Sequence, residues 1–149
     1  MTAQIPEQLT FEGKEYSLFA EPLYPWLARR RNRNIHFKRP NTANRRGYFG
    51  HWEIIDDRLF LASIRGKFPD GREVALKVLF PETPDRVFAD WVTGELCCPY
   101  GKMLAYSHAG YSSIFENSLF LRFEQGVLVG QRTVKNEPPA PDEFDLLED

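Results

Sequence analysis

Alternating apolar and polar positions run along most of the chain and predict short β-strands. The clearest example is YFGHWEI at residues 48–54, where Tyr48 and Trp52 fall on one face and His51 and Glu53 on the other. Successive side chains of a strand point to opposite faces, so this stretch is predicted as a strand that places one face in the core.

Turn residues separate these strands and predict antiparallel hairpins. The pair Asp56-Asp57 ends the strand just described and returns the chain into RLFLASIRGKF. Gly13 and Gly126 each lie between two alternating stretches and predict two more hairpins. The sequence PDG at residues 69–71 is a turn, because proline presets φ and glycine allows positive φ. The stretch 99–101, PYG, is interpreted as the turn of a further hairpin.

Helical signals are few. Pro22 and Pro25 leave room for at most a short helical turn after Pro25. The best helix start is TPDRVFADW, with Thr83 as N-cap and Pro84 in the first turn. The stretch REVALKVLF fits a strand or a short helix. The prediction is a mainly β protein (α+β at the margin), an antiparallel meander forming a curved sheet, sandwich or half-open barrel with one or two short helices.

Composition indicates one folded unit. The 149 residues are 42% hydrophobic and 14% aromatic, enough for a core in a single domain over residues 1–136. The remaining residues, 137–149, are predicted to form a mobile acidic tail. The N-terminus lacks a secretory signal, and no apolar run approaches the ~20 residues that span a bilayer. A cytoplasmic protein with no membrane partner is therefore expected, with Cys97 and Cys98 as free thiols.

Charge is distributed unevenly along the chain. The net charge is −2, yet residues 29–46 carry eight cationic side chains and no carboxylate, whereas residues 137–149 carry six acids and no base. Asn, Pro and Arg without a sustained period predict a long loop here. We refer to residues 28–47 as the basic loop, and loops of this length are usually functional or disordered.

Three explanations of the basic loop remain open at this point. Its arginines could pair with acids of the same chain. They could dock an acidic protein partner, since Arg, Trp and Tyr often anchor interfaces. They could also contact phosphate or nucleic acid, with Phe37, Tyr48, Phe49 and Trp52 near enough in sequence to stack on bases.

The leading prediction is a small non-catalytic protein that docks another macromolecule, in the manner of an inhibitor, immunity factor or adaptor. An acidic protein is the favoured partner, and the oligomeric state is left open. The stretch FDLLED near the C-terminus resembles a short linear motif that could bind a partner or fold back over the basic loop. The predicted contact residues are Trp26, Arg29, Arg30, Arg31, Arg33, Arg45, Arg46, Phe144 and Leu147.

Signatures of common enzyme classes are missing from the sequence. It contains no GxxxxGK[ST], GxGxxG, HExxH or GxSxG motif, and its Cys and His residues lack metal-site spacing, so no cofactor or metal is expected. The alternative is a nucleic-acid or nucleotide-binding protein, possibly an enzyme acting on a phosphate-containing ligand. The catalytic candidates for this alternative are His51, Glu53, His108 and Arg46.

Overall fold

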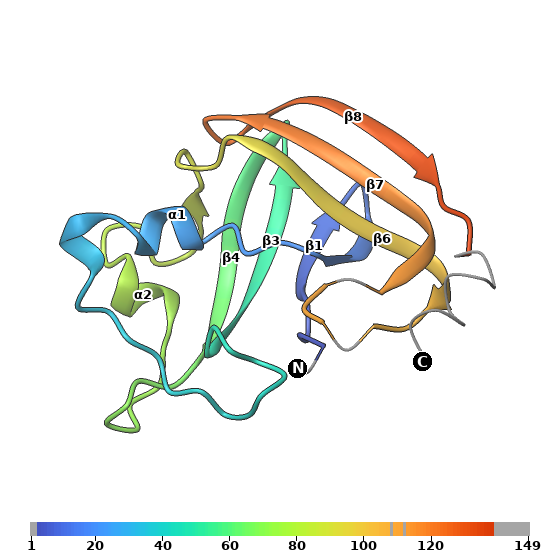
Figure 1. The fold of residues 1–149 in the computed structure, drawn as a ribbon. Helices are drawn as coiled ribbons and strands as arrows, with labels where there is room; N and C mark the ends of the chain where they lie inside the picture. Colours follow the sequence, from blue (N-terminus) through green and yellow to red (C-terminus); the bar gives the residue numbers. More distant parts are fainter. Residues whose placement is uncertain (1–2, 108, 112, 139–149) are drawn as a thin grey trace.

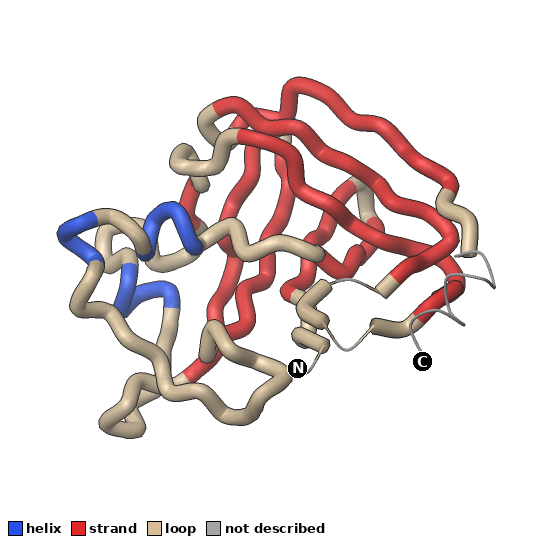
Figure 2. The backbone as a smooth tube through the Cα atoms, in the orientation of Figure 1, coloured by secondary structure: helices blue, strands red, loops and turns tan. Residues whose placement is uncertain are grey.

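The mainly β prediction is confirmed. A computed structural model of the protein describes residues 3–107, 109–111 and 113–138, and strands make up 49% of the structure against 8% helix. Figure 2 shows the strands gathered on one side and the short helices on the other. The predicted boundary between the domain and the acidic tail remains a prediction, because residues 139–149 lie outside the described part.

One mixed sheet contains all eight strands. Its hydrogen-bonded order is β2-β1-β3-β4-β8-β7-β6, and the short β5 pairs with β4 outside this path (Figure 1). The strands are β1 (Glu7–Phe11), β2 (Lys14–Leu18), β3 (Tyr48–Ile55), β4 (Arg58–Gly66), β5 (Val87–Phe88), β6 (Gly94–Ala105), β7 (Ile114–Glu124) and β8 (Val127–Lys135).

The sheet curls so that its first and last strands approach each other. Every pair of these strands is antiparallel except β1 with β3, which run parallel. Between β2 and β3 the chain makes a long crossover through the short helix at residues 24–27 and the basic loop, as a parallel pairing requires. The amide of Phe19, just after β2, donates to the carbonyl of Cys97 in β6 at 2.8 Å. The sheet is nevertheless not closed into a barrel.

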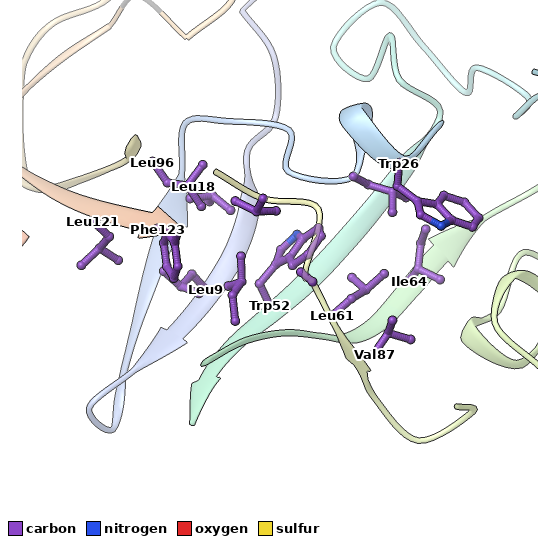
Figure 3. Close-up of a cluster of buried hydrophobic side chains, with 14 of the residues drawn as sticks. Leu9, Leu18, Trp26, Trp52, Leu61, Ile64, Val87, Leu96, Leu121 and Phe123 are labelled. Carbon is purple, nitrogen blue, oxygen red and sulfur yellow. The ribbon is translucent and has the colours of Figure 1, made fainter. Parts of the chain in front are cut away.

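The core lies inside this curl and follows the predicted alternation. Tyr48 and Trp52 of β3 are buried, as are Leu9 of β1 and Leu121 of β7. Figure 3 shows Leu9, Trp52 and Leu121 among the apolar side chains that converge from several strands. Burying one large apolar side chain stabilises a fold by about 1.5–3 kcal/mol, so this shared face is the main source of stability.

The predicted tight turns are confirmed. Asp56 and Asp57 both have positive φ, 52° and 61°, which is the backbone of the two-residue turn that matches the twist of a β-hairpin. The hairpins on either side of Gly13 and Gly126 form as β1–β2 and β7–β8. These turns fix the register that places Tyr48 and Trp52 inward.

The predicted hairpin turn at residues 99–101 is wrong. Strand β6 runs without a break from Gly94 to Ala105 and pairs with β7 on both sides of residues 101 and 102, where the register shifts. Proline is tolerated in a strand at the end of a sheet, where an amide can face away from the ladder. Gly101 has a φ of 86° and lies at a shift of register, so it forms an irregularity in the strand rather than a turn.

The predicted helix start at Thr83 is also wrong. Val87 and Phe88 form β5, and their backbones pair with Leu61 and Phe60 of β4. This pairing with a strand that is distant in sequence outweighs the local capping signal. The helices lie elsewhere: α1 covers Tyr24–Leu27 and α2 covers Leu76–Leu79. No helix within the described residues is long and apolar enough to cross a membrane.

Candidate docking surface

The basic loop begins with a turn whose backbone is fixed. Residues 29–33, which we call the arginine turn, include the 3-10 helix Arg30–Asn32. The buried Asn32 donates from Nδ2 to the carbonyl of Trp26 at 2.7 Å. The amide of Asn32 also donates to the carbonyl of Arg29 at 2.9 Å. The side chains of this turn are therefore presented from an ordered backbone.

Trp26 anchors the arginine turn from inside the core. Its ring lies 4.4 Å from that of Phe80 and 6.2 Å from that of Trp91, centroid to centroid. Trp91 in turn donates from Nε1 to the carbonyl of Pro22 at 2.7 Å. Trp26 is 7% exposed, so the prediction that it is a surface contact is wrong. A large indole stabilises the fold most when an apolar surface covers it, and here two aromatic rings do so.

The arginines of this turn remain available at the surface. Arg30, Arg31 and Arg33 are exposed and Arg29 is half-buried. The ion pairs of the described residues join other side chains, and none involves the arginine turn. Within the described part of the chain, the explanation that these arginines are neutralised by the protein's own acids therefore has no support.

Hydrogen bonds hold the second half of the basic loop against the segment before β1. Gln4 donates from Nε2 to the carbonyl of Thr42 and accepts at Oε1 from the amide of Arg45, both at 2.9 Å. The amide of Ile5 donates to the carbonyl of Ala43 at 2.8 Å. Arg45 keeps its side chain exposed, as predicted for a contact residue.

The side chain of Arg46 is buried, which contradicts its predicted place on the contact surface. Its Nε lies 3.4 Å from Oε2 of Glu7, and the two side chains are 4% and 0% exposed. The Nε1 of Trp52 donates to the other oxygen of Glu7 at 3.0 Å. Glu7 lies two residues before Leu9 and four before Phe11, so it shares their face of the strand. This position on an apolar face was the signal in the sequence for a buried carboxylate.

The Glu7–Arg46 pair is incompletely satisfied. The two groups are close enough for an ion pair, but Nε and Nη2 of Arg46 and Oε2 of Glu7 make no hydrogen bond. Burial raises the pKa of Glu7 to about 7, against the opposing effects of the Trp52 hydrogen bond and of Arg46. Arg46 also donates from Nη1 to the hydroxyl of Tyr111 at 3.4 Å, which connects the basic loop to residues 109–111.

Replacing Gly50 with alanine tests this buried arrangement. A Cβ at Gly50 would overlap Oε1 of Glu7 and lie 2.8 Å from Nε1 of Trp52. We expect Gly50→Ala to lower the free energy of unfolding by about 1–3 kcal/mol in urea denaturation, because the carboxyl must move. The control is Gly130→Ala, whose Cβ would meet only Arg122 at 3.5 Å. Equal losses in the two variants would argue against this packing.

The catalytic candidates do not all meet at one place. His51 and Glu53 lie on the outer face of β3, where Nε2 of His51 is 2.9 Å from Oγ1 of Thr10. Arg46 instead reaches Glu7, which packs with the inward-facing Trp52. His108, and the predicted contacts Phe144 and Leu147, lie outside the described residues.

Two shallow pockets flank Phe49 on the outer face. One of about 260 Å³ is lined by residues that include His51 and Arg65, and another of about 440 Å³ by residues that include Lys38 and Lys67. The guanidinium of Arg65 lies 5.7 Å from the Phe49 ring centroid. The sequence pattern did not indicate Arg65 or Lys67, because strict alternation from Leu59 and Leu61 places Arg65 inward. A register shift that leaves Ala62 without an opposite residue in β3 turns Arg65 outward.

The two cysteines behave as predicted. Both are free thiols, Cys98 buried and Cys97 partly buried. Burial raises the pKa of Cys98 to about 12 and also raises that of Cys97, so neither is activated as a nucleophile. In the described part of the chain, no group of three or more His, Cys, Asp or Glu side chains could hold a metal ion.

Comparisons of the chain with protein-family models, curated proteins and solved structures find no match. The class defined by the fold and the surface is that of a small, mainly β protein with a mixed curled sheet and a preordered cationic turn.

Proposed function

We propose that this protein is a non-catalytic, cytoplasmic binding protein that docks an acidic surface of another protein through its arginine turn. The observation that supports the proposal is the display of Arg30, Arg31 and Arg33 from a backbone held by Asn32, with no ion pair to another described residue. An inhibitor, immunity factor or adaptor would use such a surface.

Order in the turn favours binding energetically. Immobilising an interface side chain or loop costs free energy, and a backbone that is already fixed reduces this cost. Arginine is also among the side chains that most often dominate interface energies, since it combines a planar set of donors with an apolar stem. The buried Trp26 thus contributes to binding indirectly, by holding the turn.

The surroundings of the turn favour a protein over a nucleic acid. A shallow pocket of about 670 Å³ beside it is lined by Arg29 and Arg58 but also by Asp90 and Glu124. The two carboxylates would repel a phosphate backbone, whereas a protein surface can present both charges. The net charge of −2 points the same way.

The test reverses the charge of the turn. The partner captured by the wild-type protein would be identified by mass spectrometry, purified and titrated by calorimetry. The variant Arg30→Glu/Arg31→Glu/Arg33→Glu should weaken this binding by about 100-fold or more, because three favourable contacts become repulsive. The matched control is Lys14→Glu/Lys77→Glu/Lys102→Glu, which changes the charge equally at exposed sites outside the turn.

Equal affinity of the two variants would overturn the proposal. Salt dependence separates the alternative partner class, because affinity for nucleic acid falls steeply with salt in proportion to the phosphates contacted. A protein interface with three arginine contacts should lose affinity with a shallower slope, because an acidic protein surface releases no condensed counterions of the kind that surround nucleic acid.

A second candidate function, nucleic-acid or nucleotide binding, is favoured by one observation. Among the residues that the structure describes, Glu7, which is buried, is the only carboxylate lining the two pockets beside Phe49, while Arg65, Lys38 and Lys67 line them as cations. Fluorescence titration with single-stranded oligonucleotides tests it. Binding that is lost in Arg65→Glu/Lys67→Glu and kept in the arginine-turn variant would support this second function.

A further inference from the structure

The sheet contains a long strand edge without a partner. Strand β8 pairs with β7 from Val127 to Lys135 except at Val129, but on its other side it meets β4 only at Arg58 and Val127. Next to that contact, β4 pairs instead with β5 at Phe60 and Leu61. From residue 129 to residue 135, β8 therefore has no strand on this side among the described residues, and Figure 1 shows it at the outer rim.

The backbone groups at this edge can be assigned from the ladder. Beyond the end of β8, the amide of Asn136 donates to the carbonyl of Glu116, the residue after Phe115 in β7. Backbone groups of a strand alternate in direction, so those of Val134 and Arg132 also face β7. The amides and carbonyls of Gln131, Thr133 and Lys135 consequently point away from β7, toward the free edge.

We propose that this edge pairs with the same edge of a second copy of the chain, antiparallel and around a two-fold axis at Thr133. In this register Thr133 faces Thr133 of the second copy, and Gln131 faces Lys135. Between these pairs, Arg132 lies opposite Val134. Isologous pairing of this kind is the commonest symmetry of protein dimers.

The sequence of β8 is self-complementary in this register. Opposed threonines are a favourable cross-strand pair, and neither cation lies opposite its own copy. A shift that centred the axis on Arg132 would oppose two arginines, which is destabilising. Arg132 is also held on the outer face by Glu95 at 2.9 Å, which leaves the edge itself unobstructed. The three outward residues of each copy would form about six intermolecular backbone hydrogen bonds.

Other features of the strand limit the pairing to its second half. The ladder shifts register between Arg122 and Phe123, so Val129 has no opposite residue in β7 and the strand bulges there. Bulges such as the one at Val129 and lysines such as Lys135 both restrict pairing at sheet edges. The edge is therefore selective for a partner in one register rather than for any extended chain.

Charge substitution at Thr133 tests the register directly. The side chain of Thr133 is exposed, so Thr133→Lys and Thr133→Glu should both fold, with melting curves like that of the wild type at concentrations where the wild type is monomeric. Each places like charges at the two-fold axis, and the dissociation constant of the dimer should rise about tenfold or more. An equimolar mixture of the two variants opposes Lys with Glu and should restore the dimer. The exposed Thr83→Lys serves as the control and should dimerise like the wild type.

Analytical ultracentrifugation of the full chain across a range of concentrations measures these states. The expected result is a concentration-dependent dimer for the wild type and Thr83→Lys, a dimer weakened about tenfold or more for each Thr133 variant, and a dimer like that of the wild type in their mixture. A wild type that stays monomeric at every concentration would overturn the proposal. A Thr133→Lys variant that associates as tightly as the wild type would do so too. Charge reversal of the arginine turn should leave the dimer unchanged, which separates this proposal from the proposed function.

Discussion

Trp26→Ala should lower the free energy of unfolding by about 3–5 kcal/mol, the range for removing a large aromatic side chain from a core. The indole is 7% exposed and packs against Phe80 and Trp91, so alanine leaves a cavity between two rings that the turn cannot easily fill. For a chain of 149 residues this loss corresponds to a fall in melting temperature of roughly 10 °C. Urea and thermal denaturation measure both quantities.

The matched control lies two residues away. Tyr24 belongs to the same short helix but is 67% exposed, so Tyr24→Ala should change the free energy of unfolding by less than about 0.5–1 kcal/mol. If the two variants are equally stable, Trp26 is not a core residue. At a temperature where Trp26→Ala is still folded, it should also bind the partner more weakly. Alanine keeps the carbonyl that accepts from Asn32, but it loses the packed indole that fixes this carbonyl and hence the arginine turn.

Local patterns of the sequence were sufficient to predict much of the sheet. The alternation of Tyr48, Trp52 and their neighbours identified the strand and its buried face, and the Asp56-Asp57 turn identified its partner strand. These features depend on side-chain direction and turn geometry over a few residues, which the sequence specifies directly. The parallel pairing of β1 with β3 could not be predicted in this way, because it joins segments separated by the whole basic loop.

Local signals failed where a distant strand determined the structure. The Thr83–Pro84 cap is a valid helix start, but Val87 and Phe88 pair with β4 instead. Pro99 is a reasonable turn residue, but β7 pairs with the chain on both sides of it. In each case the backbone gains hydrogen bonds and burial from a partner strand, and these exceed the small free-energy preferences of single residues.

The candidate surface was only partly predictable for a related reason. A run of arginines shows where charge is concentrated, but not which of them meets a buried carboxylate. Arg45 and Arg46 are adjacent, yet only Arg46 reaches Glu7. That distinction follows from the stapling of the basic loop by Gln4, which fixes the direction of each side chain.

Arg46→Met should lower the free energy of unfolding by about 3 kcal/mol at pH 8, because it leaves the ionised carboxylate of Glu7 buried without its cation. Methionine keeps the apolar stem beside Tyr48 and Phe49, whose ring centroids lie 5.6 and 5.1 Å from the guanidinium, so packing changes little. The control is Arg45→Met, an exposed neighbour, which should change stability by less than about 0.5 kcal/mol.

The same variant should cost much less at pH 5, and the reason lies in the titration of Glu7. Burial raises the pKa of Glu7 from the ordinary 4.5 to about 7, so the folded state holds this proton more tightly than the unfolded state. The stabilising contribution of protonated Glu7 is therefore complete below about pH 4.5 and is lost as the pH rises through about 7, a span worth about 3 kcal/mol.

At pH 5 most Glu7 is protonated in the folded protein and does not need Arg46, whereas at pH 8 it is ionised and does. Nε and Nη2 of Arg46 make no hydrogen bonds, so at pH 5 the removal of this buried cation also removes a desolvation cost that offsets part of the loss. We expect a loss within about 1 kcal/mol at pH 5 in urea denaturation. If the free energy of unfolding falls by as much or more at pH 5 than at pH 8, the carboxylate of Glu7 does not depend on Arg46 only when it is ionised. The role of this ion pair in anchoring the basic loop would then also be contradicted.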